Sequence, residues 1–177
     1  LKKLGSDPLV LGSVGKDFSP YADWMDKNHI SRRFISETTD SYTAQAFIIT
    51  DSIGNQITAF HPGAMENPIR CPISEIEADL AIVSPDSKNI MIENCKQCSE
   101  ANIPFIFDPG QGTPMFDGDE LIELITLSKW VIVNEYESKM IETKLSLSPE
   151  QIAKKVEAYI ITLGERGSEI YFNNDKA

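Results

Sequence analysis

The sequence predicts an α/β fold in which a mostly parallel sheet carries helices on both faces. Three short apolar segments, 80–83, 104–107 and 131–133, have the composition of buried strands, and each is followed by a stretch with helical periodicity. Strands and helices that alternate in this way are typical of parallel sheets. Two further segments, 44–50 and 56–60, flank a run of turn-forming residues and predict an antiparallel hairpin instead.

The first part of the chain predicts a strand, a turn and a helix. Residues 1–5 have the pattern of a final helical turn that ends at Gly5. Residues 9–14 predict a strand that leads into a turn at 15–17. Residues 18–29 then predict a helix, because their aromatic and apolar side chains recur at helical spacing.

The hairpin interrupts this alternation of strands and helices. Its two strands are joined by Asp51–Asn55, which is rich in turn residues. An excursion of this kind is either an edge meander or a flap over a site. We therefore divide the chain into an α/β core formed by 1–31 and 62–177, and a hairpin insertion at 32–61.

From residue 77 onward the alternation becomes regular. Strands are predicted at 80–83, 104–107, 131–133, 160–163 and 168–172, and helices at 87–101, 119–128 and 135–144. Ser148 begins a capping box with proline at the first helical position, which predicts one more helix. The turn residues Asn173–Asp175 follow the last strand, so residues 170–172 predict one half of a hairpin, whose returning strand we do not expect within this chain. We therefore expect a fragment of a longer fold that lacks both ends.

The charge of the chain narrows the classes of partner. The formal net charge is -11 and the pI is near 4.6, which disfavours nucleic acid and anionic membrane surfaces because both require clustered Lys and Arg. No apolar run approaches the ~18 residues of a membrane span, and no secretion signal is recognisable. These features predict a cytoplasmic protein that binds neither nucleic acid nor membrane.

The cysteines and histidines do not form a metal-binding pattern. Cys71, Cys95 and Cys98 are odd in number and lack a second ligand pair, so we expect reduced thiols rather than disulfides or zinc. His29 and His61 are far apart in the sequence, and we interpret both as structural or surface residues.

Polar side chains follow four of the predicted strands, at the point where each strand ends. They are Ser84 and Asp86, Asp108 with Gly110, Asn134 with Glu137, and Thr162 with Gly164. In a parallel sheet all four groups lie at the same edge, which is where open α/β sheets bind their ligands.

Two of these strand ends suggest a nucleotide-dependent phosphotransferase. Glu137, three residues after Asn134, suits a magnesium ion held through its waters, although a solvated first turn of a helix explains the same acids. Thr162–Gly167 offers a hydroxyl and bare backbone to a nucleotide, although a glycine-containing hairpin turn explains the same residues. The glycine-rich segment 108–113 is not a Walker A loop, because no Gly-Lys-Ser/Thr follows it.

Several motifs in order resemble the ribokinase-like (PfkB) family of sugar and nucleoside kinases. They are Asn134-x-x-Glu137, Thr162-Leu163-Gly164-x-x-Gly167, the strand and turn Leu11–Asp17, and the hairpin motifs Thr43–Phe47 and Asp51–Phe60. The longer strings TAQAFIIT, NQITAFHPGAM and FDPGQGTPMFDG are similar to bacterial adenosine kinase-like members. The resemblance covers nearly the whole chain.

The resemblance implies a three-layer ribokinase-like fold with a small antiparallel β-lid. It also implies transfer of the ATP γ-phosphate to a hydroxyl of a nucleoside or sugar, with adenosine favoured and Mg²⁺ as the metal. Nucleotide-binding roles then fall on Asn134, Thr162, Leu163, Gly164 and Gly167, and Glu137 holds the metal through water. Gln45 and Phe60 in the lid shield the acceptor, and the lid offers a possible homodimer surface.

The sequence departs from the family pattern at both ends. The family's Gly-Gly substrate motif belongs before Leu1, and its GxGD motif with the catalytic aspartate belongs after Ala177, so we expect no catalytic residue in this chain and no turnover by it alone. The alternative is a non-catalytic nucleotide-binding or scaffold module with a kinase-like core, which binds ATP without transferring phosphate.

Overall fold

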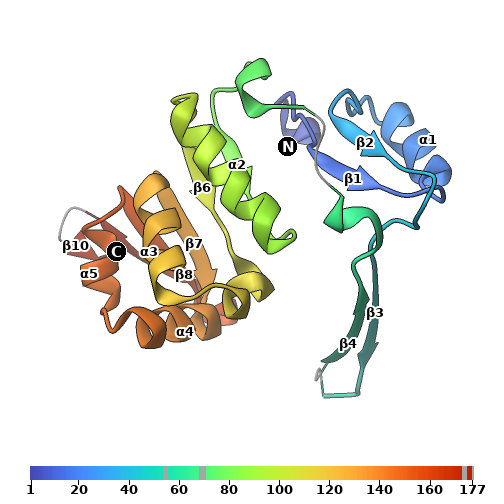
Figure 1. Ribbon diagram of the computed structural model, residues 1–177. Helices are drawn as coiled ribbons and strands as arrows, with labels where there is room; N and C mark the ends of the chain where they lie inside the picture. Colours follow the sequence, from blue (N-terminus) through green and yellow to red (C-terminus); the bar gives the residue numbers. More distant parts are fainter. Residues whose placement is uncertain (54–55, 68–70, 173–174, 177) are drawn as a thin grey trace. The chain divides into compact units, whose positions relative to one another are not determined.

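The computed structural model describes residues 1–53, 56–67, 71–172 and 175–176, and these fall into two units, Leu1–Cys71 and Pro72–Ala177. Figure 1 labels their helices and strands. Gly54 and Asn55 of the predicted hairpin turn, and Asn173–Asn174 of the predicted final turn, lie outside the described residues.

The first unit begins with a small parallel pair of strands covered by one helix. β1 (Gly12–Val14) pairs with β2 (Ile35–Glu37), and α1 (Ser19–Lys27) connects them. The helix starts with a proline in its first turn, where the missing N–H costs nothing. Its apolar face forms a small core that contains Val14, Phe18, Ala22 and Met25, with Ile30 and Ile35 packed against it.

Two predictions for this region need correction. The strand expected at 9–14 is only three residues long, and Leu9 makes an isolated bridge to Ser31 instead. The strand β2 was not expected, because three residues are too few to show a periodic pattern. The helical turn at the start of the chain is a short 3-10 helix (Lys2–Leu4), which ends at Gly5 with φ of 89° as a left-handed glycine cap.

The predicted hairpin is confirmed. β3 (Gln45–Thr50) and β4 (Gln56–His61) pair antiparallel, with Gln45 opposite His61 and Thr50 opposite Gln56. A short 3-10 helix, Gly63–Glu66, follows it. Every residue of both strands is exposed, including Phe47 at 62%, Ile49 at 73% and Ile57 at 75%. An isolated two-stranded hairpin with such a surface is marginally stable by itself.

The second unit contains a six-stranded mixed sheet in the order β10-β9-β8-β7-β6-β5. The strands are β5 (Ala81–Val83), β6 (Phe105–Phe107), β7 (Trp130–Asn134), β8 (Ala158–Thr162), β9 (Ser168–Phe172) and β10 (Asp175–Lys176). β5 to β8 run parallel, whereas β9 and β10 are antiparallel to their neighbours. The hairpin half predicted at residues 170–172 is confirmed, because β10 pairs antiparallel with β9, but the expectation that its returning strand is missing from the chain was wrong.

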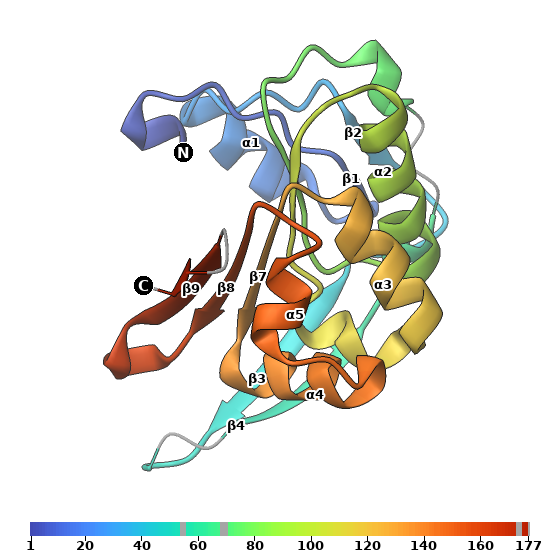
Figure 2. The ribbon, with the colours of Figure 1, turned by 90° about the vertical axis from the view of Figure 1, so that its left-hand side faces the viewer.

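Four helices cover one face of this sheet, as Figure 2 shows. They are α2 (Lys88–Glu100), α3 (Gly118–Leu127), α4 (Glu135–Leu145) and α5 (Pro149–Ala153). Burial alternates along the strands accordingly: Val131 and Val133 are buried, and Ile132 between them is half-buried. Each fully buried side chain of this size contributes about 1.5–3 kcal/mol through the hydrophobic effect. The helices and the parallel strands confirm the α/β class, whereas the helices expected on both faces of the sheet cover only one face within the described residues.

The core between the helices and the sheet is apolar and contains two cysteines. Its fully buried members include Met91, Phe105, Phe107, Leu121, Leu124, Ile125, Ile141 and Ile152. Cys95 and Cys98 of α2 are also buried and form no disulfide. Burial raises the pKa of both thiols, that of Cys98 to about 11, so at neutral pH they are protonated side chains that pack as small hydrophobes.

Candidate functional site

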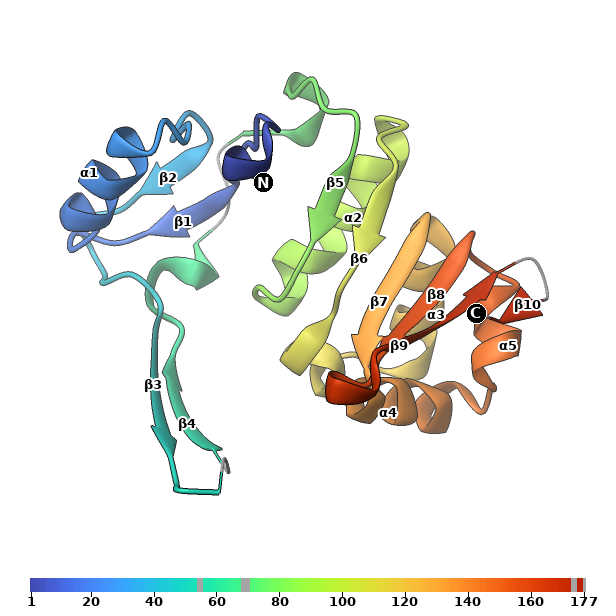
Figure 3. The same cartoon turned by 180° about the vertical axis from the view of Figure 1, so that it is seen from behind.

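The carboxyl ends of β5, β6, β7 and β8 lie at one edge of the sheet, where Figure 3 shows their arrowheads. We call the residues that follow these ends the rim: 84–86, 108–110, 134–137 and 162–167. The rim residues Asn134 and Thr162 are register partners on adjacent parallel strands. The sequence-based expectation that these two motifs meet at one edge is therefore confirmed.

Asn134 and Glu137 form a reciprocal cap at the start of α4. The Glu137 N–H donates to Asn134 Oδ1 at 2.9 Å, and the Asn134 N–H donates to Glu137 Oε2 at 2.8 Å. The two bonds satisfy backbone donors that the first turn of a helix leaves free. The structural explanation of these residues as a capped helix start is thus correct. A ligand can still bind to Asn134, because within the described part of the chain its Nδ2 group donates no hydrogen bond.

Residues Thr162–Gly167 form the tight turn between β8 and β9. Thr162 pairs with Ser168, and the Leu163 N–H donates to the Gly167 carbonyl at 2.8 Å. Gly164 and Gly167 have φ of 60° and 87°, a region that side chains disfavour. A Cβ atom added at either glycine would meet no heavy atom within 4 Å. The segment is therefore a hairpin turn, and its backbone is open to a ligand on the glycine side.

An ion pair that the sequence did not predict connects these two parts of the rim. Arg166 Nη2 lies 2.5 Å from Glu135 Oε2, so the hairpin turn is tied to the first residue of α4. Both side chains are mostly exposed, and pairs of this kind contribute about 0–1 kcal/mol to stability. No local pattern marks the pair, because its members are separated by 31 positions in the sequence.

Two further carboxylates of the rim are electrostatically perturbed. Burial raises the pKa of Asp108, and the negative charge of Glu137 raises it further. Burial also raises the pKa of Asp86. The Asp108 N–H donates to the Val83 carbonyl at 2.9 Å, which holds this residue at the ends of β5 and β6. We had placed Asp108 at a strand end without assigning it to a site; the influence of Glu137 is visible only in the structure.

This carboxylate pair suits a hydrated divalent cation better than a fully protein-coordinated one. Among the described residues, no three His, Cys, Asp or Glu side chains gather as a metal-binding group. Magnesium keeps several of its waters and uses only one or two carboxylates, usually together with phosphate oxygens. The charges of Asp108 and Glu137 repel each other, and this repulsion contributes to the raised pKa of Asp108. A bound cation would offset the repulsion.

In the first unit, Gln45 and Phe60 lie on opposite faces of the β3–β4 hairpin. Phe60 is the register partner of Ala46, and Gln45 is that of His61; residues next to each other on a strand point to opposite sides. The structure therefore does not bring Gln45 and Phe60 together on one face.

Gln45 instead lies at the base of the hairpin beside Asp17. Its Nε2 donates to Asp17 Oδ2 at 3.3 Å. The other oxygen of Asp17 accepts from the Thr43 N–H at 2.7 Å and from its hydroxyl at 2.8 Å. These bonds from Thr43 hold the pKa of Asp17 below its usual value. Asp17 had been noted only as part of the strand-and-turn motif 11–17, and its contact with Gln45 makes it a candidate binding residue.

A separate hollow of about 540 Å³ lies before β5 and β6, lined by Ile76, Glu77, Asp79 and Ala101 among others. These residues precede the strands, so the hollow belongs to the amino-terminal edge of the sheet and not to the rim.

Within the described part of the chain, every helix is too short or too polar to cross a membrane.

The parallel sheet, the capped acidic helix and the glycine turn at its edge define an α/β protein of the ribokinase type. The sequence matches the pfkB family of carbohydrate kinases over residues 1–177, and the chain belongs to this family.

Curated relatives and solved structures agree with this assignment. The nucleoside kinase of Methanocaldococcus jannaschii is 29% identical over 99% of this chain and 59% of its own length. That of Methanothermobacter thermautotrophicus is 26% identical over 96% and 57%. A structure of Burkholderia thailandensis nucleoside kinase in complex with inosine is 42% identical with a TM-score of 0.96, over 99% of this chain and 58% of that one. The chain thus spans less than two thirds of the length of these relatives.

Proposed function

We propose that the natural polypeptide containing this chain is a kinase that transfers a phosphoryl group from ATP to a hydroxyl of a purine nucleoside, adenosine first. The observation that carries the proposal is the pairing of Asn134 with Thr162 at the rim, next to the capped Glu137 and the open glycines of the hairpin turn. The similar Burkholderia enzyme has been solved with inosine and with ADP and inosine, which supports a nucleoside acceptor and an adenine nucleotide donor.

The nucleotide-binding role falls on the two paired strand ends. The free amide of Asn134 and the hydroxyl of Thr162 supply polar groups toward the phosphates, and the backbone at Leu163, Gly164 and Gly167 lets the nucleotide approach without a side chain between. Glycines at such positions are the common means of close contact between backbone and nucleotide.

Magnesium would be held at the rim by Glu137 through water, and we add Asp108 as a second residue that would hold the same ion. A magnesium ion supplies charge neutralisation for the transferred phosphoryl group. The residues of this chain orient its waters, since Glu137 is fixed by its bond to the Asn134 N–H and Asp108 by its bond to the Val83 carbonyl.

The acceptor would be bound by the first unit. Asp17 and Gln45 offer a carboxylate oxygen and an amide to sugar hydroxyls, and Phe60 on the other face of the hairpin serves to exclude water. The family resemblance assigns the general base to a segment that this chain does not contain, so the activity is proposed for the natural polypeptide, in the cytoplasm. General-base catalysis contributes about 10²–10⁴-fold, so we do not expect residues 1–177 alone to turn over.

The exposed apolar side chains of the β3–β4 hairpin support a homodimer through this element. Phe47, Ile49 and Ile57 give the hairpin an apolar surface that a monomer in water leaves uncovered. Contiguous exposed apolar patches of this kind mark interaction sites.

The test is a phosphorylation assay on the longest natural polypeptide that contains this chain. ATP, Mg²⁺ and either adenosine, inosine or ribose are supplied, and the phosphorylated product is quantified. We expect phosphorylated nucleoside, and less of it from Asn134→Ala at an ATP concentration that does not saturate the variant. Binding of MgATP without any phosphoryl transfer would favour the alternative of a non-catalytic scaffold module, and no binding at all would contradict both.

A further inference from the structure

The side-chain ammonium of Lys144 forms hydrogen bonds with the loop that follows Asp108. This loop contains the 3-10 helix Gly110–Met115 and leads into α3. Lys144 Nζ donates to the carbonyl oxygens of Thr113 at 3.3 Å, Pro114 at 3.1 Å and Phe116 at 2.5 Å. An ammonium has three donors, and here all three go to backbone oxygens of one loop. Among the described residues, Lys144 makes no ion pair that competes with these bonds.

The part of the loop that Lys144 binds is joined by a hydrogen bond to the start of the loop at the rim. Thr113 is fully buried, and its hydroxyl donates to the Gly110 carbonyl at 2.8 Å. Gly110 has φ of 48°, and a Cβ atom there would lie 2.5 Å from Pro85 Cγ. The backbone between Gly110 and Phe116 thus has little freedom while Lys144 holds it, and Asp108 lies two residues before this segment.

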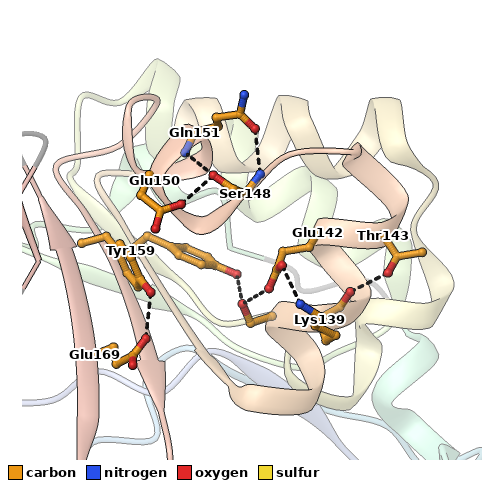
Figure 4. Close-up of polar contacts among 10 residues, drawn as sticks. Lys139, Glu142, Thr143, Ser148, Glu150, Gln151, Tyr159 and Glu169 are labelled. Carbon is orange, nitrogen blue, oxygen red and sulfur yellow. Dashed lines mark hydrogen bonds and ion pairs between the residues drawn. The ribbon is translucent and has the colours of Figure 1, made fainter.

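The other end of the same helix carries the cap at the rim. Lys144 lies in the last turn of α4, and Asn134 and Glu137 lie at its start. The helix is held on the sheet midway, where Tyr159 Oη donates to Ser138 Oγ at 3.0 Å and Ser138 Oγ lies 3.3 Å from Glu142 Oε1. Figure 4 shows Tyr159 and Glu142 at this anchor, and Lys139, which is mostly exposed, bonded to Glu142.

We propose that Lys144 is a positioning residue that, by holding residues 113–116 against the end of α4, fixes Asp108 relative to Glu137. The inference rests on the proposed function in one respect, since it assigns these two carboxylates to one hydrated magnesium ion. Lys144 touches neither the metal nor the nucleotide. It acts through the loop, as partners outside the ligand shell commonly do in metal sites.

The test compares Lys144→Met, Lys144→Arg and a control on the same helix in the natural full-length polypeptide. The control is Lys139→Met, which also removes a positive charge but lies at 77% side-chain exposure and bonds only within the helix, to Glu142 at 3.0 Å. Calorimetry measures ADP affinity with and without Mg²⁺, and amide hydrogen exchange measures protection of residues 108–116.

Lys144→Met is expected to lower the Mg²⁺-dependent part of ADP affinity about tenfold, the size seen when partners outside the ligand shell are removed. It should also speed exchange in residues 108–116, whereas exchange at the start of α4 stays unchanged. Lys144→Arg, whose guanidinium also donates to several carbonyls, should recover at least half of the lost affinity, and Lys139→Met should match the parent. If Lys144→Met does not fold, Lys144→Gln, with two amide donors, is measured against the same expectation.

Faster exchange in residues 108–116 with unchanged Mg²⁺-dependent affinity would overturn the inference, because Lys144 would then support the loop without any effect on the rim. If the parent protein binds no MgADP, the proposed function fails. The inference is then decided by amide hydrogen exchange at residues 108–110, which should be faster in Lys144→Met because the loop that Lys144 holds continues back to Asp108. Unchanged exchange at residues 108–110 would refute it.

Discussion

Replacing Asn134 by alanine should separate helix capping from nucleotide binding, because the chain contains a matched control. Asp117 and Glu120 cap α3 with the same reciprocal bonds, at 2.8 and 2.9 Å, that Asn134 and Glu137 make on α4. The α3 cap follows the loop 110–116 and not a strand end, so it does not belong to the rim. A purely structural role predicts the same behaviour for both alanine variants, and a binding role does not.

The expected magnitudes follow from the bonds that each variant loses. Either substitution removes one N-cap bond and should lower the free energy of unfolding by about 1 kcal/mol. Asp117→Ala also removes a negative charge from a helix start, which adds roughly 0.3–1 kcal/mol, so it should be the more destabilising of the two. On the proposed function, only Asn134→Ala also loses an amide that would bind a charged phosphate, a bond of about 1.5–3 kcal/mol that corresponds to roughly 10–100-fold in affinity.

The assay pairs urea unfolding with calorimetric titration of MgADP, on the natural full-length polypeptide. We expect both variants to unfold at lower urea, with MgADP affinity at least tenfold weaker for Asn134→Ala and within twofold of the parent for Asp117→Ala. Equal losses of affinity in the two variants, or unchanged affinity in Asn134→Ala, would refute the assignment of Asn134 to the nucleotide.

Three further substitutions test other parts of the structure. Asp108→Asn should raise the melting temperature without metal, because the raised pKa of Asp108 means that its negative charge destabilises the folded protein. The same substitution should weaken the stabilisation of the protein by MgADP. It should also remove the gain in stability that the parent shows as pH falls through the raised pKa of Asp108 toward the ordinary value of 3.8. Tyr159→Phe should lose about 1 kcal/mol at pH 7 with its bond to Ser138. Burial raises the pKa of Tyr159 from 10.0 to about 12, so the parent loses stability as pH rises from 10 to 12, and urea midpoints should fall less steeply there in the variant. Ile57→Lys on the exposed hairpin should convert a dimer to a monomer in sedimentation, with the unfolding of the protomer changed by less than about 0.5 kcal/mol.

Features that depend on neighbours in the sequence were predictable. The strands at 104–107 and 131–133 are apolar runs whose burial alternates in the folded chain, and their prediction was correct within a few residues. The cap at Ser148 was recognised because both of its members lie within three positions, and the structure shows both of its bonds. The positions of Asn134 and Thr162 at one edge followed from the parallel order of strands, which alternation with helices already implied.

Features that depend on contacts between distant residues were not predictable. The ion pair of Glu135 with Arg166 and the grip of Lys144 on the loop 113–116 join positions about 30 apart, and no spacing rule connects them. The faces of Gln45 and Phe60 depend on the register of the hairpin, and a shift of one residue would place them on the same face. The strands β2 and β10 have three and two residues, which is too short for any periodicity.

The charge of the rim gives the proposed magnesium a definite physical task. The acidic residues of the rim are Asp86, Asp108, Glu135, Glu137 and Glu165, and its one basic residue, Arg166, is already paired with Glu135 within the described structure. A nucleoside triphosphate that approaches these carboxylates is repelled unless a cation screens the phosphates from the carboxylates. Two like charges about 4 Å apart near a protein surface repel each other by about 4 kcal/mol. On the proposed function, the metal therefore does more than assist transfer: it makes an acidic edge of the sheet able to hold an acidic ligand. The same repulsion gives the proposed role of Lys144 a physical reason, since the charges of Asp108 and Glu137 by themselves push the two carboxylates apart.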